Sequence, residues 1–278
     1  TGKKTMKPLL QLLARNRAFA RQARADTLVR VGATAQEATV YMYGPIVQSA
    51  LEAEFWGGVA SETFVPALRA LDVDTIHLRI DSPGGDVFGG QAIAQALRDS
   101  KARVIAHVDG LAASAATIVA IAADEVEIAI GGMFMVHRAW TFALGNTHDM
   151  LEAAALLEKI DGTLATQYAQ RTGADEAAML DVMDEETWMT AQEAVDSKLV
   201  DRIANQDEQD EPAAASTQWD LSAYANAPAP AAPIGASLEV LDFRVAAEES
   251  FDGEDRRFVP VQDRIDFLLR DRRRLVRR

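Results

Sequence analysis

One stretch of this chain, residues 76–120, constrains the fold most strongly, because it contains the same local pattern twice. Each half reads as a buried strand, a tight turn of glycine or small residues, and a helix: IHLRIDSPGGDVFGGQAIAQAL, then ARVIAHVDGLAASAATIVA. A turn of this kind brings backbone N–H groups and a side chain to the carboxyl edge of a parallel sheet. The pattern therefore predicts an α/β fold of βαβ units with a site at that edge.

The two turns offer different chemical groups. The first, residues 82–86 (SPGGD), offers backbone amides without side chains, and the second, residues 110–116 (GLAASAA), offers the hydroxyl of Ser114 among residues too small to crowd a substrate. A hydroxyl beside free amides is typical of acyl-transfer sites. A phosphate loop is disfavoured, because no Gly-Lys-Ser/Thr follows and the glycine spacing is not GxGxxG.

Composition excludes several other classes of site. The chain has 278 residues and no cysteine, which rules out disulfides, thiolate metal sites and a cysteine nucleophile. No run of roughly 18 apolar residues occurs, so we expect no membrane-spanning helix. The ends are basic, with eight Lys/Arg against one Asp in residues 1–30 and seven Arg against three Asp in residues 262–278, and the body between them is acidic. We therefore expect no nucleic-acid-binding core, and the basic ends stay open as contacts for an acidic partner or nucleic acid.

The pattern of apolar residues predicts the order of the elements. The expected strands lie at 38–43, 75–80, 103–108, 125–129, 131–136 and 199–203, and the expected helices at 62–71, 89–100, 113–123, 150–172, 175–183 and 190–197. Ser61 is the expected N-cap of the first of these helices, and Thr190 with Glu193 fits a capping box at the start of the last.

Four segments follow from this order. Residues 1–37 form a basic N-terminal arm with an amphipathic helix over 6–24, and residues 38–205 form the α/β domain. Residues 206–236 are acidic and then rich in Ala and Pro, a composition that predicts a linker unable to order itself, and an exposed place for self-cleavage. Residues 237–278 hold a possible strand over 238–245 and a basic helix over 264–278.

Three side chains in the domain suggest acyl-transfer chemistry. Ser114 opens a helix, where developing negative charge is favoured. His137 ends the apolar strand MFMV, at the same sheet edge as the turn of Ser114, and is the best-placed general base of the four histidines. A carboxylate should orient the imidazole, and the spacing leaves four candidates open: Asp181, Asp184, Glu185 and Glu186. The amides of Gly85 and Ala115 are the expected oxyanion donors.

Four motifs taken together, SPGGDVFGG, DGLAASAAT, MFMVHRAW and ETWMTAQEAVDSKLVD, resemble the ClpP family of serine peptidases in order and spacing. More narrowly, they resemble the ClpP-like head maturation (prohead) proteases of tailed phages and prophages. The resemblance covers about residues 38–204. It implies the ClpP/crotonase-like fold of stacked βαβ units with a projecting long helix, here over 150–172, which commonly mediates oligomerisation.

The resemblance also implies the roles of particular residues. It places the nucleophile on Ser114, the general base on His137 and the oxyanion amides on Gly85 and Ala115. It places the third member of the triad on Glu186, where the ClpP peptidases proper have Asp, and Asp184 is the reserve candidate. It implies no cofactor and no metal.

The leading interpretation is therefore a serine endopeptidase that forms an acyl-enzyme and cleaves scaffold or capsid-protein segments without ATP. Its expected partners are a protein substrate and further copies of itself, and its expected location is the host cytoplasm and the inside of the phage procapsid. Three alternatives remain: a Ser–Lys peptidase of the SppA type using Lys101 or Lys159, an acyl-CoA hydratase or isomerase of the same fold, and an inactive capsid-assembly component.

Overall fold

The structure is a computed structural model, and it describes residues 30–31, 36–204 and 219–228. All the described residues belong to one structural unit, Thr1–Pro230. The helices predicted over 6–24 and 264–278 and the strand predicted over 238–245 lie outside the described residues, as do both ends of the predicted linker.

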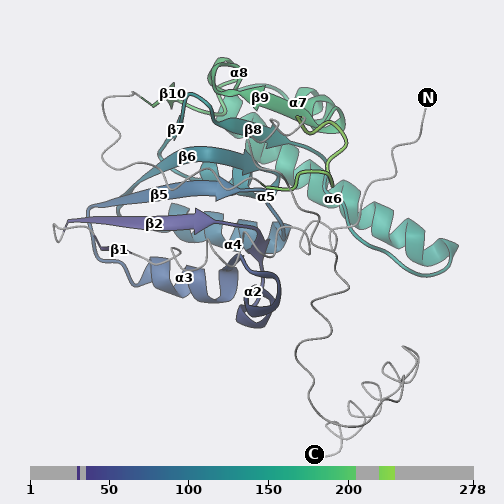
Figure 1. The fold of residues 1–278 in the computed structure, drawn as a ribbon. Coiled ribbons are helices and arrows are strands. Elements are labelled where there is room, and N and C mark those ends of the chain that lie inside the picture. The colour runs from purple at the N-terminus through teal and green to yellow at the C-terminus, as the bar shows by residue number, and fades with distance from the viewer. Residues whose placement is uncertain (1–29, 32–35, 205–218, 229–278) are drawn as a thin grey trace, which may run out of the picture. The chain divides into compact units, whose positions relative to one another are not determined.

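A mainly parallel sheet forms the centre of the described unit, as the repeated strand–turn–helix pattern predicted (Figure 1). Its strand order is β1-β2-β5-β6-β7-β10, and β8 pairs with both β6 and β9. Only the β1–β2 and β8–β9 pairs are antiparallel among these described strands. The bounds are β1 Arg30–Val31, β2 Glu37–Tyr43, β5 Thr75–Ser82, β6 Arg103–Ala113, β7 Glu125–Ile128, β8 Met133–Val136, β9 Thr187–Thr190 and β10 Arg202–Ile203. A separate parallel pair consists of β3 Ile46–Val47 and β4 Val59–Ala60.

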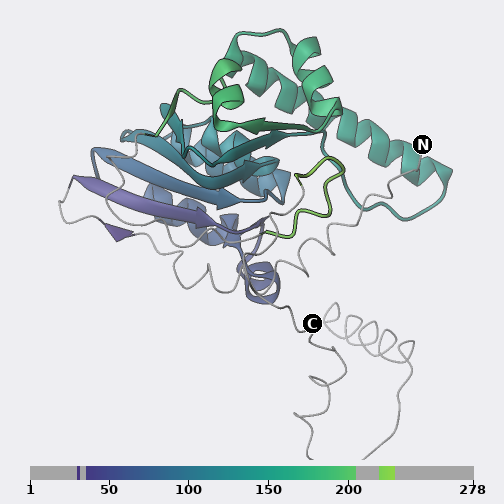
Figure 2. The ribbon, with the colours of Figure 1, turned by 45° about the horizontal axis from the view of Figure 1, so that its top comes forward.

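Helices cover one face of the sheet, and the longest of them projects beyond it (Figure 2). Their bounds are α2 Ala50–Trp56, α3 Ser61–Arg69, α4 Val87–Arg98, α5 Ala115–Ala120, α6 Thr147–Thr172, α7 Glu176–Asp184 and α8 Ala191–Asp196. Helix α6 is the projecting helix that the sequence predicted, three residues longer at its start because Asn146 and Asp149 form a capping box there. Within the described part of the chain, no helix is long and apolar enough to cross a membrane.

Alternation along the strands gives the sheet two different faces. On β5, Leu78 and Ile80 are fully buried in the core under the helices. The alternate residues His77 and Arg79 point to the opposite face, where they pair with polar groups on the next strand. The large apolar core therefore lies on the helical face of the sheet.

Strand β6 is longer than predicted, and its length brings the candidate residues together. Its first half pairs with β7 and its last residues pair with β8, after a register shift between Ile80 and Ser82 in the neighbouring β5. The apolar pattern ended at Val108, because Asp109 and Gly110 interrupt it, but backbone pairing continues to Ala113. Strand β8 can therefore lie beside the turn that follows β6.

Two local expectations are wrong in detail. Ser61 is the first residue of α3 and not its N-cap; Ala60 takes that position, and the Ser61 hydroxyl donates to the Gln48 carbonyl oxygen at 3.2 Å. The predicted closing strand over 199–203 is reduced to the two residues of β10, because Leu199 and Val200 donate their N–H groups to Ala194 at the end of α8.

The linker prediction is wrong for residues 219–228. Trp219, Ala223 and Tyr224 are buried there, in a small cluster with Leu111 and Met135 on the face of the sheet away from α5. Composition predicted that the Ala/Pro-rich segment buries too little surface to order itself. Two large aromatic side chains in ten residues are enough to order this part of it, since each buries roughly 150–250 Å².

Candidate active site

Ser114 lies in the sharp turn between β6 and α5. Its backbone has φ 55° and ψ −127°, in a region that favours glycine and costs other residues about 1–3 kcal/mol. Its N–H donates to the Met135 carbonyl oxygen at 2.9 Å, which fixes the turn against β8. The hydroxyl makes no capping hydrogen bond to α5. The turn therefore holds Ser114 in a strained conformation and leaves its hydroxyl available to another group.

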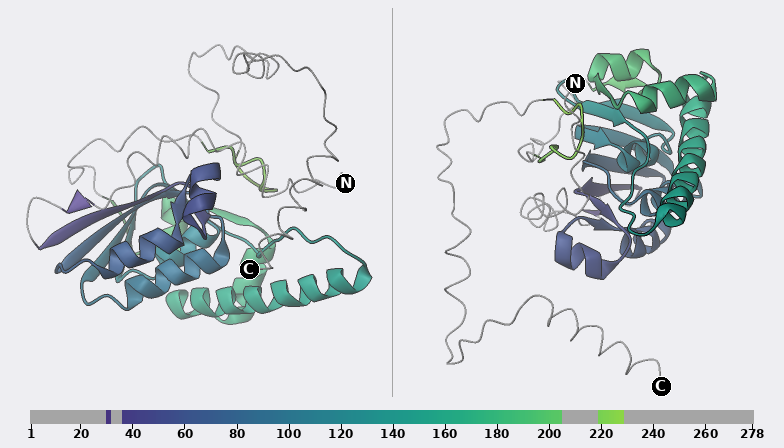
Figure 3. Two further views of the ribbon diagram at one scale, coloured as in Figure 1. Left: turned by 90° about the horizontal axis from the view of Figure 1, so that it is seen from below. Right: turned by 90° about the vertical axis from the view of Figure 1, so that its right-hand side faces the viewer.

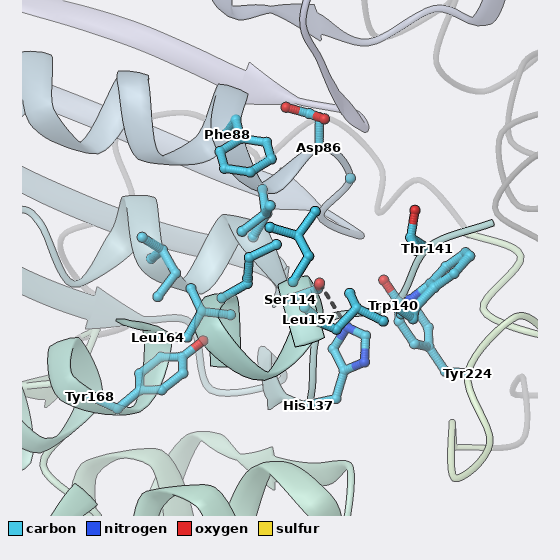
Figure 4. A pocket seen from close by; sticks show the side chains of 17 residues that line it. Asp86, Phe88, Ser114, His137, Trp140, Thr141, Leu157, Leu164, Tyr168 and Tyr224 are labelled. Atoms are coloured by element: carbon cyan, nitrogen blue, oxygen red, sulfur yellow. Dashed lines mark hydrogen bonds between the residues drawn. The ribbon is translucent and has the colours of Figure 1, made fainter. Parts of the chain in front are cut away.

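That group is His137, the residue after β8. Because β8 runs parallel to the end of β6, with Ala113 opposite Met135, both strands deliver their next residues to the same edge. Nε2 of His137 lies 2.7 Å from Oγ of Ser114 (Figure 4). Burial lowers the pKa of His137 to about 4, and the negative charge of Glu186 opposes that decrease. The imidazole is therefore neutral at pH 7 and can accept the hydroxyl proton.

The loop that follows His137 is held by a buried carboxylate from α6. Asp161 is 4% exposed and accepts the N–H of Ala139 at 2.7 Å, and Nη1 of Arg138 lies 3.4 Å from its other oxygen. The backbone on the far side of His137 is thus anchored to the long helix. Because the backbone on both sides of His137 is fixed, the side chain loses little conformational entropy when it pairs with the serine.

The four carboxylates proposed for the third position fall into different environments. Asp184 forms a two-pronged ion pair with Arg138, which keeps the pKa of Asp184 below its usual range. Asp181 and Glu185 are exposed. Glu186 alone of the four interacts electrostatically with His137. No hydrogen bond joins Glu186 to His137 in the described structure, and Glu186 accepts hydrogen bonds from Trp188, Ala225 and Asn226 instead.

The first glycine turn is packed directly against Ser114. Gly84 and Gly85 have φ values of 87° and 142°, which only glycine adopts readily. A Cβ atom on Gly84 would lie 2.7 Å from the Cβ of Ser114 and 3.1 Å from the nitrogen of Ala115. The close approach of the two turns therefore requires glycine, and it places the backbone of Gly85 and Ala115 along one pocket with Ser114.

This pocket has a volume of about 190 Å³ and a mainly apolar wall. Side chains from α4, α5 and α6 lie on one side of Ser114 and His137, and Trp140 and Tyr224 lie on the other side (Figure 4). The apolar lining residues are Val87, Phe88, Ile118, Leu156, Leu157, Ile160 and Leu164, with Trp140, Tyr168 and Tyr224. Such a wall suits an apolar side chain of a substrate next to the reactive serine.

The lysines of the alternative Ser–Lys arrangement lie elsewhere. Lys101 and Lys159 are exposed and neither lines the pocket. Because the Ser114 hydroxyl already has His137 at hydrogen-bond distance, the geometry favours a histidine base over a lysine base.

Sequence reasoning missed the contribution of residues 219–228. Tyr224 lines the pocket and packs edge-on against His137, with ring centroids 5.2 Å apart. The signal was present in the sequence, since Trp219 and Tyr224 are large aromatic residues in an otherwise small and polar segment.

Comparisons with known proteins identify the family and the fold of this chain. The chain matches the Clp protease family model over residues 58–207, more than half of its length. It is 34% identical over 132 residues to ATP-dependent Clp protease proteolytic subunit 2 of Treponema denticola, covering 46% of this chain and 66% of that protein. It is 29% identical over 133 residues to the proteolytic subunit of Deinococcus radiodurans, covering 47% of this chain and 65% of that protein.

Each match spans about two thirds of the length of the relative. Among solved structures, a ClpP1 mutant from Listeria monocytogenes shares the fold, with a TM-score of 0.51 and 24% identity, covering 61% of this chain and 92% of that one. The predicted ClpP-like fold class is thus confirmed. With the family model matching residues 58–207, this chain belongs to the Clp protease family.

Proposed function

We propose that this chain is a serine peptidase that hydrolyses peptide bonds through an acyl-enzyme. The observation that carries the proposal is the 2.7 Å contact between Nε2 of a buried, neutral His137 and Oγ of a strained Ser114. If His137 were only structural, nothing would require a serine beside it with a backbone conformation that favours glycine. Membership of the Clp protease family supports the same activity.

The proposed reaction follows from these positions. The Ser114 oxygen attacks the carbonyl carbon of the peptide bond while His137 Nε2 takes its proton, and Glu186 stabilises the resulting imidazolium. The amides of Gly85 and Ala115 donate to the oxyanion. His137 then passes the proton to the amine nitrogen as the C–N bond breaks. Water hydrolyses the remaining ester by the reverse proton path, which restores Ser114.

A fluorophosphonate probe tests the serine directly. We expect wild-type protein to be labelled at Ser114, Ser114→Ala to lose labelling, and His137→Ala to be labelled at least about 10³-fold more slowly. Ser197→Ala is the matched control and should be labelled at the wild-type rate, because Ser197 follows α8 and does not line the pocket. Labelling of Ser114→Ala at the wild-type rate would overturn the proposal.

We further propose that the substrate is a protein and that the enzyme works as a head maturation protease on scaffold or capsid-protein segments in the host cytoplasm and procapsid. Two observations support this narrower proposal: the four sequence motifs, and the basic segments 1–30 and 262–278 at the ends of an acidic chain. The alternative is an ATP-dependent proteolytic subunit, as the relatives in Treponema and Deinococcus are named. Degradation of a labelled unfolded protein with and without a Clp ATPase and ATP separates the two. Activity that requires the ATPase would refute head maturation.

Self-association is part of the proposal. Helix α6 and the loop before it carry exposed apolar side chains, of which Leu144 is 87% exposed, Phe142 67% and Leu151 64%. A row of such side chains is typical of a surface buried in an assembly. Light scattering should give a mass that is a multiple of the chain mass, and a Leu144→Glu/Leu151→Glu double variant should reduce it.

A further inference from the structure

Residues 219–228, here called the strap, lie outside the Clp protease match and cross the site on the face of the sheet away from α6 (Figure 3). The strap forms neither helix nor strand, with a turn and bends over residues 222–226, and it belongs to the same structural unit as the site. Its contacts reach two places that the proposed reaction uses.

The first place is the glycine turn. Nε1 of Trp219 donates to Oδ1 of Asp81 at 3.0 Å, and both side chains are buried. The Tyr224 hydroxyl donates to the carbonyl oxygen of Pro83, the residue before the two glycines. The strap is therefore anchored on the strand and turn that place Gly85 beside Ser114.

The second place is the acid. The N–H of Ala225 lies 2.8 Å from one carboxylate oxygen of Glu186, and the N–H of Asn226 lies 2.6 Å from the other. The side-chain amide of Asn226 also donates to the carbonyl oxygen of Glu185 at 2.8 Å, which fixes the strap to the same loop. Two consecutive backbone amides thus hold the two oxygens of one carboxylate.

A clamp of this kind matters because the glutamate is otherwise loosely held. Glu186 has three rotatable side-chain bonds and a backbone φ of 49°, and its one other hydrogen bond from the described residues comes from Trp188 at 3.2 Å. Backbone N–H groups that bond both oxygens of a carboxylate hold its orientation. Held in this way, the charge of Glu186 acts on His137.

Tyr224 links the two contact points and covers the base. Its ring packs edge-on against His137 at 5.2 Å and against Trp188 at 5.7 Å. The ionisable groups of the described structure that face His137 are Glu186 from the loop before β9 and Tyr224 from the strap. Burial holds the pKa of Tyr224 well above its usual range, so that the phenol stays neutral and adds no charge. The strap therefore supplies an apolar cover and leaves Glu186 as the charge that acts on the imidazole.

We propose that the strap is a positioning element of the active site: its Ala225 and Asn226 amides hold Glu186 in place for His137, and Tyr224 shields the pair from water. This inference rests on the proposed function, since it assigns Glu186 and His137 their roles in peptide hydrolysis. It adds that the site is completed by a segment of the same chain beyond the family's matching region.

Two pairs of full-length variants test the strap. Ala225→Pro removes one clamping N–H, and Ala225→Gly keeps it. Tyr224→Ala removes the cover, and Tyr224→Phe keeps the ring but loses the hydroxyl, with its hydrogen bond to Pro83 and its contact with the Ser114 side chain. We expect Ala225→Pro and Tyr224→Ala to lower kcat for peptide hydrolysis about 10- to 100-fold with little change in KM, and the two matched controls to stay within about fivefold of wild type. Circular dichroism and melting temperature establish that each variant is folded.

A second measurement does not depend on activity. NMR titration of ring-labelled histidine, assigned with His137→Gln, follows the pKa of His137 directly. Because burial is the main cause of its low value, Tyr224→Ala should move the pKa from about 4 toward its ordinary value of about 6.5. The acid limb of kcat/KM should move upward in pH with it.

The outcomes separate the strap from the proposed function. If Ser114 reacts with the fluorophosphonate and all four variants retain wild-type kcat and His137 pKa, the strap only packs and the inference fails while the peptidase proposal stands. If Ala225→Pro and Tyr224→Ala are faster than wild type, the strap is an inhibitory cover and the positioning role is overturned. If wild-type Ser114 is unreactive, the peptidase proposal fails, and a His137 pKa unchanged in Tyr224→Ala would overturn the shielding role independently.

Discussion

The two turns at the carboxyl edge of the sheet both contain positive φ values, but they place different residue types there. In the first turn, Gly84 and Gly85 take the positive φ values, and the nearby Ser82 hydroxyl is bound into the backbone. In the second turn, a serine takes the positive φ and its hydroxyl faces His137. The first turn exposes backbone amides and leaves space beside Ser114, so it uses residues without side chains. The second turn must present the Ser114 hydroxyl oxygen, and it does so although the backbone is strained.

The largest expected effect is on kcat/KM, and it comes from Glu186, the carboxylate that acts on His137 beside the second turn. Glu186→Gln should lower kcat/KM about 10²- to 10³-fold, because the imidazolium formed on His137 loses the one negative charge that faces it among the described residues. Asp184→Asn should change kcat/KM less than about threefold, since Asp184 is committed to Arg138. Steady-state kinetics on a fluorogenic peptide measure both. A larger loss in Asp184→Asn would reassign the third position to the reserve candidate.

The requirement for glycine in the first turn predicts the next largest effect. Gly84→Ala should lower the free energy of unfolding by about 3 kcal/mol and slow fluorophosphonate labelling, because the new Cβ would lie 2.5 Å from the Ala113 carbonyl oxygen. Gly162→Ala in α6, where the added methyl meets no atom within 4 Å apart from its own helix backbone, is the control and should be neutral or stabilising by up to about 1 kcal/mol. Equal effects in chemical denaturation would show that the turns do not need their close approach.

The carboxylate under the first turn predicts a pH effect on stability. Burial raises the pKa of Asp81 to about 6, above its value of 3.8 when exposed, and the hydrogen bond from Trp219 only partly opposes this. The folded state therefore binds this proton more tightly than the unfolded state, and this contribution to stability is present below pH 3.8 and lost as pH rises to about 6. Asp81→Asn should remove that loss and raise the free energy of unfolding at pH 7 by on the order of 2 kcal/mol. Urea unfolding of wild type and Asp81→Asn at pH 4 and pH 7 measures this change in the free energy of unfolding. A pH dependence in Asp81→Asn identical to that of wild type would contradict the raised pKa of Asp81.

The smallest effect is the strain in the second turn. Ser114→Gly should raise the free energy of unfolding by about 1 kcal/mol while abolishing activity, because glycine adopts φ 55° and ψ −127° without penalty. Ser82→Gly in the first turn should be destabilising, since it removes the buried hydroxyl that bonds Gly44. Melting temperatures that fall in both variants would show that the second turn stores no strain.

Local sequence patterns predicted much of the fold and two of the site residues. The alternation of apolar strands and helices requires only near neighbours in the chain, and parallel βαβ units deliver strand ends to one edge. Ser114 and His137 were therefore placed together from their positions after β6 and β8, and the capping box of Thr190 and Glu193 was found at the start of α8. The resemblance to the ClpP family supplied what spacing could not, namely the choice of Glu186 among four carboxylates.

The sequence by itself thus determined the order of the elements, the two turns and the pair of Ser114 and His137. Only the tertiary structure decided how Asp184 and Glu186 differ, because that depends on Arg138 and on amides about 40 residues away in the chain. It also decided that residues 219–228 pack over the site. Composition treats a segment as isolated, whereas Trp219 is ordered by Asp81, 138 residues earlier. The aromatic residues mark the segment, but their partners over such separations depend on the finished fold.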